Sequence, residues 1–123
     1  WDYQRAAECF DKAIPQLKSF APSELSFYYF AAAESHFNLE QYDKALPLYE
    51  KMLTLCQDDE KADAYYKLGF IHTNRNEWLS ALDNFHLALT YYRRFRPDEQ
   101  ARIAQIRNMI VGCCDKIDQL SKK

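Results

Sequence analysis

The sequence predicts an all-α protein in which helical hairpins repeat along the chain and stack as an α-α solenoid of about six helices. Three observations support this prediction. The chain resembles itself after a shift of 36 residues, apolar residues recur with helical spacing, and only two of the 123 residues are glycine. A sheet protein needs glycine in its many tight turns, so composition and periodicity both favour helices.

The repeat becomes visible when the chain is shifted against itself. A shift of 36 residues aligns Tyr29 with Tyr65, His36 with His72, Asn38 with Asn74, Tyr42 with Trp78, Ala45 with Ala81, Tyr49 with Phe85, and Leu53 with Leu89. A shift of 39 residues aligns Tyr3, Ala6, Phe10 and Ile14 with Tyr42, Ala45, Tyr49 and Leu53. Periods of this length are typical of stacked helical hairpins.

Each repeat holds two amphipathic stripes with a small residue on each. Tyr65, Leu68, Gly69 and His72 follow helical spacing, and Trp78, Ala81, Phe85 and Ala88 do so on a second helix. Small residues allow two helices to approach closely, while a ring fills the space beside the crossing. We therefore expect Gly69 and Ala81 (Ala33 and Ala45 in the preceding copy) at helix crossings, next to Phe85 or Tyr49.

Capping residues and prolines set the expected boundaries. We expect one domain over residues 1–123, with a half repeat at 1–20, repeats at 23–57 and 59–95, and a terminal helix at 98–119. Helices are expected near 2–20, 23–39, 42–56, 59–75, 78–95 and 98–119, starting at Pro22-Ser23, at Asp58 or Asp59, and at Pro97-Asp98. Pro15 should kink the first helix and Pro47 should bend the third. The last helix should seal the open end of the stack with one stripe, formed by Ile103, Ile106, Ile110, Cys113 (or Cys114), Ile117 and Leu120.

Composition limits the classes of partner and the cellular environment that we expect for this chain. The net charge of −2 and pI near 5.9 provide no basic field for nucleic acid. No apolar run approaches the roughly 20 residues that cross a bilayer. Trp1 opens directly into helical pattern without a signal peptide, and the four cysteines lack a C-x-x-C spacing. We therefore expect a cytoplasmic fragment of a larger protein, with buried, free thiols.

No residues suggest catalysis, a cofactor or a metal. His36 and His72 share one register, so they should lie about 10 Å apart on packed helices, whereas zinc ligands converge to about 2 Å from one ion. We expect both to pack inside the repeats and His86 to be exposed. The sequence lacks the phosphate-loop, nucleophile-elbow and metalloprotease motifs. The acids at 58–60 should cap a helix, and the basic run from Arg93 to Arg96 should lie at a helix C-terminus, with docking of an acidic partner as its alternative role.

The inner face of the stack is the expected binding surface. It should carry aromatic rings and one asparagine per repeat, which together would hold the backbone and side chains of an extended peptide. Two alternatives stay open: the rings could pack between adjacent first helices, and the asparagines could be ordinary repeat-derived surface residues. The candidate residues are Phe27, Phe30, Glu34, Asn38, Tyr66, Lys67, Phe70 and Asn74, with Asn108 on the last helix as an extension.

These residues resemble a known family. The pattern Tyr65-x-x-Leu68-Gly69 followed by Ala81-x-x-x-Phe85 resembles the tetratricopeptide (TPR) repeat over nearly the whole chain. The spacing is longer than the family's, and Gln57 and Arg93 stand where its closing proline would fall. The resemblance implies a protein- or peptide-binding module. A clamp for a terminal carboxylate is not expected, because Lys67 is the only basic side chain among the candidate residues.

A second resemblance narrows the function. The stretch from Leu25 to Asn38, followed by Gln41 to Leu46, is similar to bacterial peptide-sensing regulators of the Rap type and to related quorum-sensing transcription factors. It implies that Asn38 and Asn74 hold a signalling peptide, with any output domain outside this sequence. The alternative is a scaffold that assembles proteins without a small peptide ligand and that could self-associate through its open repeat ends.

Overall fold

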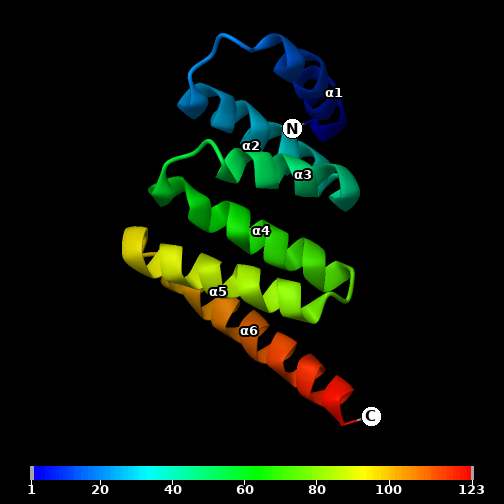
Figure 1. Cartoon of the computed structure of the whole chain (residues 1–123), viewed down its shortest axis with the longest axis vertical. Helices are drawn as coiled ribbons and strands as arrows, with labels where there is room; N and C mark the ends of the chain where they lie inside the picture. The colour runs from blue at the N-terminus through cyan, green and yellow to red at the C-terminus, as the bar shows by residue number, and fades with distance from the viewer. Residues whose placement is uncertain (1, 123) are drawn as a thin grey trace. The chain divides into compact units, whose positions relative to one another are not determined.

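The structure, a computed structural model, describes residues 2–122 and contains six α-helices and no strand in that range. This confirms the predicted all-α fold. Figure 1 shows the helices in chain order, α1 (Tyr3–Ala13), α2 (Pro22–Asn38), α3 (Tyr42–Leu53), α4 (Lys61–Asn74), α5 (Trp78–Phe95) and α6 (Gln100–Ser121). Two short 3₁₀ helices, η1 (Ile14–Gln16) and η2 (Asp58–Glu60), follow α1 and precede α4.

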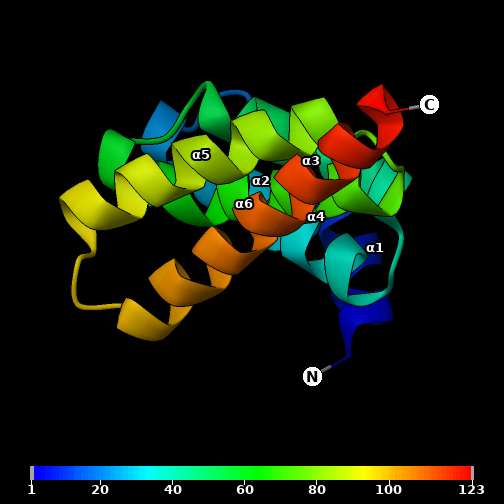
Figure 2. The same cartoon turned by 90° about the horizontal axis from the view of Figure 1, so that it is seen from below.

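The chain divides into two compact units. Unit 1 covers Trp1–Gln57 and unit 2 covers Asp58–Lys123. In unit 1, α2 packs against both α1 and α3, and in unit 2, α5 packs against both α4 and α6 (Figures 1 and 2). The expected hairpins are therefore the pairs α2–α3 and α4–α5. The single TPR domain within a larger protein stays a prediction.

The first helix is shorter than the sequence predicted. It ends at Ala13, and η1 follows it, so the prediction of a helix to residue 20 is wrong. Pro15 has no N–H to donate and its ring clashes with the carbonyl four residues earlier. The proline ends this helix instead of kinking it. The other boundaries shift less: α3 ends at Leu53, α4 begins at Lys61 after η2, and α6 begins at Gln100.

Two equivalent turns close α2 and α4. In the first, the Gln41 N–H donates to the carbonyl of His36 at 2.9 Å, and the Glu40 N–H donates to that of Phe37 at 2.9 Å. Equivalent bonds from Glu77 and Asn76 close α4. This is the Schellman pattern, which requires a left-handed residue just after the helix. Glu40 and Asn76 occupy that position, with φ of 60° and 59°.

Small residues lie at the helix crossings, as predicted. Ala33 on α2 and Ala45 on α3 are fully buried, as is Tyr49 on α3, and the two helices pack against each other. In unit 2, a Cβ added at Gly69 would lie 2.7 Å from the ring of Phe85. Only glycine therefore permits this spacing of α4 and α5 without a shift. The rings and small residues interlock as the repeat pattern predicted.

The last helix covers α5 with part of its apolar stripe. Ile103, Ile106 and Cys113 are buried, while Leu120 is 55% exposed. The prediction that the whole stripe seals the core is therefore wrong at its C-terminal end. The described thiols are all free, but Cys9 and Cys114 are exposed, so the prediction of buried thiols holds only for Cys113 and in part for Cys56. Burial raises the pKa of the Cys113 thiol, which favours its neutral, unreactive form.

Candidate functional site

A groove in unit 1 brings together three of the predicted binding residues. It lies between α1 and α2 and has a volume of about 370 Å³. We call it the α1–α2 groove. Phe27, Glu34 and Asn38 were predicted from the sequence, whereas Tyr3 and Phe10 on α1 were assigned only to the repeat pattern. The groove is lined by Tyr3, Phe10, Phe27, Ala31, Glu34, Ser35 and Asn38.

The half-buried ring of Tyr28 contacts two of the rings that line the groove. Tyr28 contacts Phe10 edge to face at 6.3 Å between ring centroids, and it contacts Phe27 at 5.5 Å. Phe20 reaches the same ring from the loop after η1, at 5.9 Å. Phe27 nevertheless stays 63% exposed. The ring of Phe27 thus packs against Tyr28 and keeps most of its surface exposed, where a partner side chain can contact it.

Polar groups gather where Glu34, Ser35 and Asn38 line the groove. The hydroxyl of Tyr49 donates to the Glu34 carboxylate, and the Ser35 hydroxyl donates to the Ala31 carbonyl at 2.8 Å. Asn38 donates from Nδ2 to the Glu34 carbonyl at 2.7 Å. A side-chain amide has two N–H groups, so this bond engages one of them. The sequence did not reveal that Asn38 folds back onto its own helix.

His36 on α2 links the two helices that form the groove. Its ring is buried, and Nε2 lies 2.9 Å from a carboxylate oxygen of Asp11 on α1. Its Nδ1 lies 2.7 Å from Oε1 of Gln41, in the turn that closes α2. His72 makes the equivalent contact with Glu77 at 2.9 Å. The prediction that His36 packs inside the repeat is confirmed; these hydrogen bonds explain why a histidine recurs there.

The predicted residues of unit 2 are arranged differently. Tyr66 is only 7% exposed, and it packs 6.1 Å from Phe85 and beneath the guanidinium of Arg102, which lies 4.2 Å above its ring. The expectation that Tyr66 forms an open binding surface is therefore wrong, because α5 and α6 cover it. Phe30 in unit 1 is half-buried, and its ring centroid lies 6.1 Å from that of Tyr49.

The other predicted residues are more accessible. Lys67 and Phe70 are half-buried on α4, and Asn74 is exposed at its last position. Asn108 is exposed on α6, about one and a half turns before Cys113. Asn38 and Asn74 belong to different units, so a row of asparagines along a peptide stays a prediction.

A polar network in unit 2 was missed from the sequence. Asp63 on α4 accepts a hydrogen bond from the Tyr92 hydroxyl and, at 2.6 Å, one from Nη1 of Arg96. Burial, aided by the bond to Asp63, raises the pKa of Tyr92 far above its ordinary value. Arg96 also pairs with Glu99. Because Arg96 is engaged here, only Arg93 and Arg94 of the predicted basic run are exposed at the end of α5.

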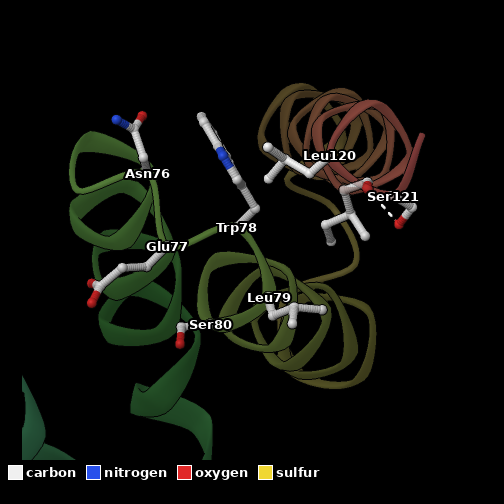
Figure 3. Close-up of a pocket in the computed structure, with 8 residues that line it drawn as sticks. Asn76, Glu77, Trp78, Leu79, Ser80, Leu120 and Ser121 are labelled. Atoms are coloured by element: carbon white, nitrogen blue, oxygen red, sulfur yellow. Dashed lines mark hydrogen bonds between the residues drawn. The ribbon is translucent and has the colours of Figure 1, made fainter. Parts of the chain in front are cut away.

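A second hollow lies at the other end of α5. Figure 3 shows the Trp78 ring standing beside the C-terminal turns of α6, with Leu120 directed toward it. This hollow has a volume of about 430 Å³, and Leu79 on its rim is 67% exposed. The ammonium of Lys116 lies 5.8 Å from the centre of the Trp78 ring. The sequence assigned Trp78 to the core and did not predict this hollow.

A search with known protein-family models and a search of curated protein sequences both gave no match. The groove and the internal repeat therefore carry the functional argument. Within residues 2–122, no cluster of three His, Cys, Asp or Glu side chains could hold a metal ion. No helix in that range is long and apolar enough to cross a membrane.

Proposed function

We propose that this chain is a TPR-like binding module that holds a segment of another protein in the α1–α2 groove, and that it acts by binding and not by catalysis. The observation that supports it most directly is the exposed ring of Phe27 at the edge of an apolar groove with polar side chains along part of its lining. Binding sites commonly combine apolar walls with a few placed polar groups.

The exposed aromatic surface gives a reason for a partner to bind. Complete burial of a phenylalanine side chain contributes roughly 1.5–3 kcal/mol, so covering a ring that is 63% exposed contributes a large part of that range. Glu34 and Asn38 can then select the partner's orientation through hydrogen bonds. The Phe27 ring thus contributes affinity, and the polar side chains set the orientation of the bound segment.

A narrower form of the proposal is a sensor for a bacterial signalling peptide. The similarity of residues 25–46 to the Rap-type regulators supports it, together with the position of Asn38 in the groove. In this form the peptide is extended, and the remaining donor and acceptor of the Asn38 amide bind its backbone.

A scaffold is the second candidate function. The observation that favours it is the hollow beside Trp78, where Leu79 and Leu120 are exposed in one unit. Surfaces of this kind can join proteins without a small peptide ligand. Concentration-dependent light scattering tests it: a scaffold that self-associates through this hollow should lose its larger species on Leu79→Ser. A single monomeric species at all concentrations would argue against self-assembly.

The test of the proposed function is selection from a displayed peptide library, followed by affinity measurement. Phe27→Ser should weaken binding of the selected peptides at least about tenfold, equivalent to 1.4 kcal/mol or more. Asn38→Ala should weaken it by about 1–3 kcal/mol if the amide contacts the peptide. Leu79→Ser is the matched control, since Leu79 is equally exposed but belongs to unit 2. Failure to select any peptide, or equal effects of the two serine variants, would contradict the proposal.

A further inference from the structure

Two arginines of unit 2 each lie over a tyrosine ring. The guanidinium of Arg96 lies 5.0 Å from the centre of the Tyr92 ring. That of Arg102 lies 4.2 Å from the centre of the Tyr66 ring. A guanidinium that contacts a ring through its planar face keeps the N–H groups at its edge for hydrogen bonds. The two arginines can therefore be compared by what their N–H groups bind.

Arg96 has carboxylates for its N–H groups. Its Nη1 donates to the Asp63 carboxylate on α4 at 2.6 Å. Its Nε pairs with the carboxylate of Glu99, the residue before the first turn of α6. Arg96 thus has a ring beside its guanidinium and two acids as counter-charges.

Arg102 has the ring but no acid. Its guanidinium is half-buried, and among the residues that the structure describes no carboxylate pairs with it. Asp63 lies three residues before Tyr66 on α4, but it already accepts hydrogen bonds from Tyr92 and Arg96. A half-buried charge is less well hydrated than an exposed one, and pairing with an opposite charge offsets that loss. Arg102 therefore has a favourable place for an acid from outside.

We infer that Arg102, over the Tyr66 ring, is a docking point for the carboxylate of an aspartate or glutamate side chain on a partner protein. The comparison within unit 2 supplies the argument: Arg96 shows which group completes an arginine of this kind, and Arg102 lacks that group. A guanidinium can bind a carboxylate through two parallel N–H···O bonds. The site is formed by α4 and α6, so this inference goes beyond the α1–α2 groove and does not depend on it.

The surroundings of Arg102 leave room for such a group. Arg102 lines a hollow of about 480 Å³ together with Asp98, Glu99, Gln100, Ala101 and Gln105. Glu99 is already paired with Arg96, whereas Asp98 is exposed and should repel an incoming carboxylate. The side-chain amide of Gln105 can donate to a peptide carbonyl beside the acid.

The strength of one ion pair indicates the size of the partner. A partly exposed pair contributes little affinity alone, so Arg102 would set the orientation of a larger protein interface. This argument favours an acid carried by a protein over a free small carboxylate. It also predicts weak binding of short peptides, which NMR can detect.

The experiment follows the arginine side-chain Nε–H signals of the ¹⁵N-labelled full chain during an NMR titration. The probe is a short alanine peptide with a central glutamate and both ends blocked, added to millimolar concentration. The Arg102 signal should shift in a saturable way, whereas the Arg96 signal should stay in place because its acids are already present. The same peptide with a central glutamine should shift neither signal.

Three variants test the site through the backbone amides near Gln105. Arg102→Gln should abolish their shifts, because the cation is lost. Asp98→Asn removes the repelling acid and should tighten binding at least about twofold. This side chain is exposed, so the second variant keeps the inference testable if Arg102→Gln does not fold. Lys116→Gln is the matched control, since Lys116 lies 5.8 Å from the centre of another ring, that of Trp78, and its loss should change nothing.

Several outcomes would overturn the inference. They are the absence of an Arg102 shift, equal shifts with the glutamine peptide, and equal loss of binding on Lys116→Gln. An alanine peptide with a free C-terminus tests the other source of a carboxylate, and tighter binding of this peptide would show that the site takes a chain end instead. Phe27→Ser should leave binding of the glutamate peptide unchanged, so failure of this inference and failure of the proposed function are separate results.

Discussion

Gly69 is the residue on which the closest helix contact of unit 2 depends. A Cβ there would lie 2.7 Å from two ring atoms of Phe85, a ring that is fully buried and cannot move cheaply. Overpacking costs about 1–3 kcal/mol, whereas replacing a helical glycine by alanine gains up to about 1 kcal/mol. We expect Gly69→Ala to destabilise the protein by about 1 kcal/mol in urea unfolding.

Gly112 provides the control for that substitution. It lies inside α6, and an added Cβ would meet nothing within 4 Å. Gly112→Ala should therefore stabilise the protein by up to about 1 kcal/mol through helix propensity alone. If Gly69→Ala stabilised it equally, the contact with Phe85 would be softer than the geometry indicates.

Tyr92 is the residue that should make stability depend on alkaline pH. Its pKa is raised in the folded protein by burial and by the bond to Asp63, so it keeps its proton at a pH where the unfolded chain loses one. The unfolded state then binds fewer protons, and stability falls as pH rises above about 10. Below that pH this contribution is constant.

Removing the Tyr92 hydroxyl tests this explanation. Tyr92→Phe should cost about 1–3 kcal/mol at pH 7, because the half-buried carboxylate of Asp63 loses one of its donors. It should also flatten the fall in unfolding free energy between about pH 10 and 11.5, measured by urea denaturation. If the unfolding free energies of the wild type and of Tyr92→Phe fell in parallel with pH, groups other than Tyr92 would cause the loss of stability at alkaline pH.

At the scale of the elements, the hairpins depend on two left-handed turn residues. Glu40 and Asn76 both have positive φ, which costs glutamate more than asparagine and costs glycine nothing. Glu40→Gly should stabilise the protein by up to about 1 kcal/mol, and Asn76→Gly should stabilise it less. Thermal unfolding checks the order of the two effects; a loss of stability on Glu40→Gly would mean that the Glu40 side chain makes a stabilising contact that outweighs the strain.

At the scale of the whole molecule, burial is uneven along the chain. In α1 only Ala7 is buried, whereas α5 buries Ala81, Phe85, Ala88, Leu89 and Tyr92. Local opening requires less free energy where few apolar contacts are broken. Native-state hydrogen exchange should therefore be at least about tenfold faster in α1 than in the centre of α5. Equal protection would show that α1 opens only with global unfolding, in spite of its sparse contacts.

The helical repeat could be predicted from the sequence because its signals are local and periodic. The shift of 36 residues, the alanines at 45 and 81 and the glycine at 69 identify helices and the places where they cross. Phe27, Glu34 and Asn38 were also recognised as binding candidates, since the inner stripe follows from the same periodicity. The end of α1 was missed, because whether a proline kinks or ends a helix depends on the contacts that follow it.

The lining of the groove was decided by tertiary structure. Phe30 and Tyr66 share the predicted stripe with Phe27, yet Tyr66 is buried and Phe30 is half-buried, and the rings of Phe85 and Tyr49 lie against them. Tyr3 and Phe10 join the groove only because α1 packs beside α2. Periodicity along one helix specifies a face, whereas exposure of that face depends on which neighbouring helix covers it. The sequence alone therefore determined the helices and their crossings, and the tertiary packing decided which of their rings remain open to a partner.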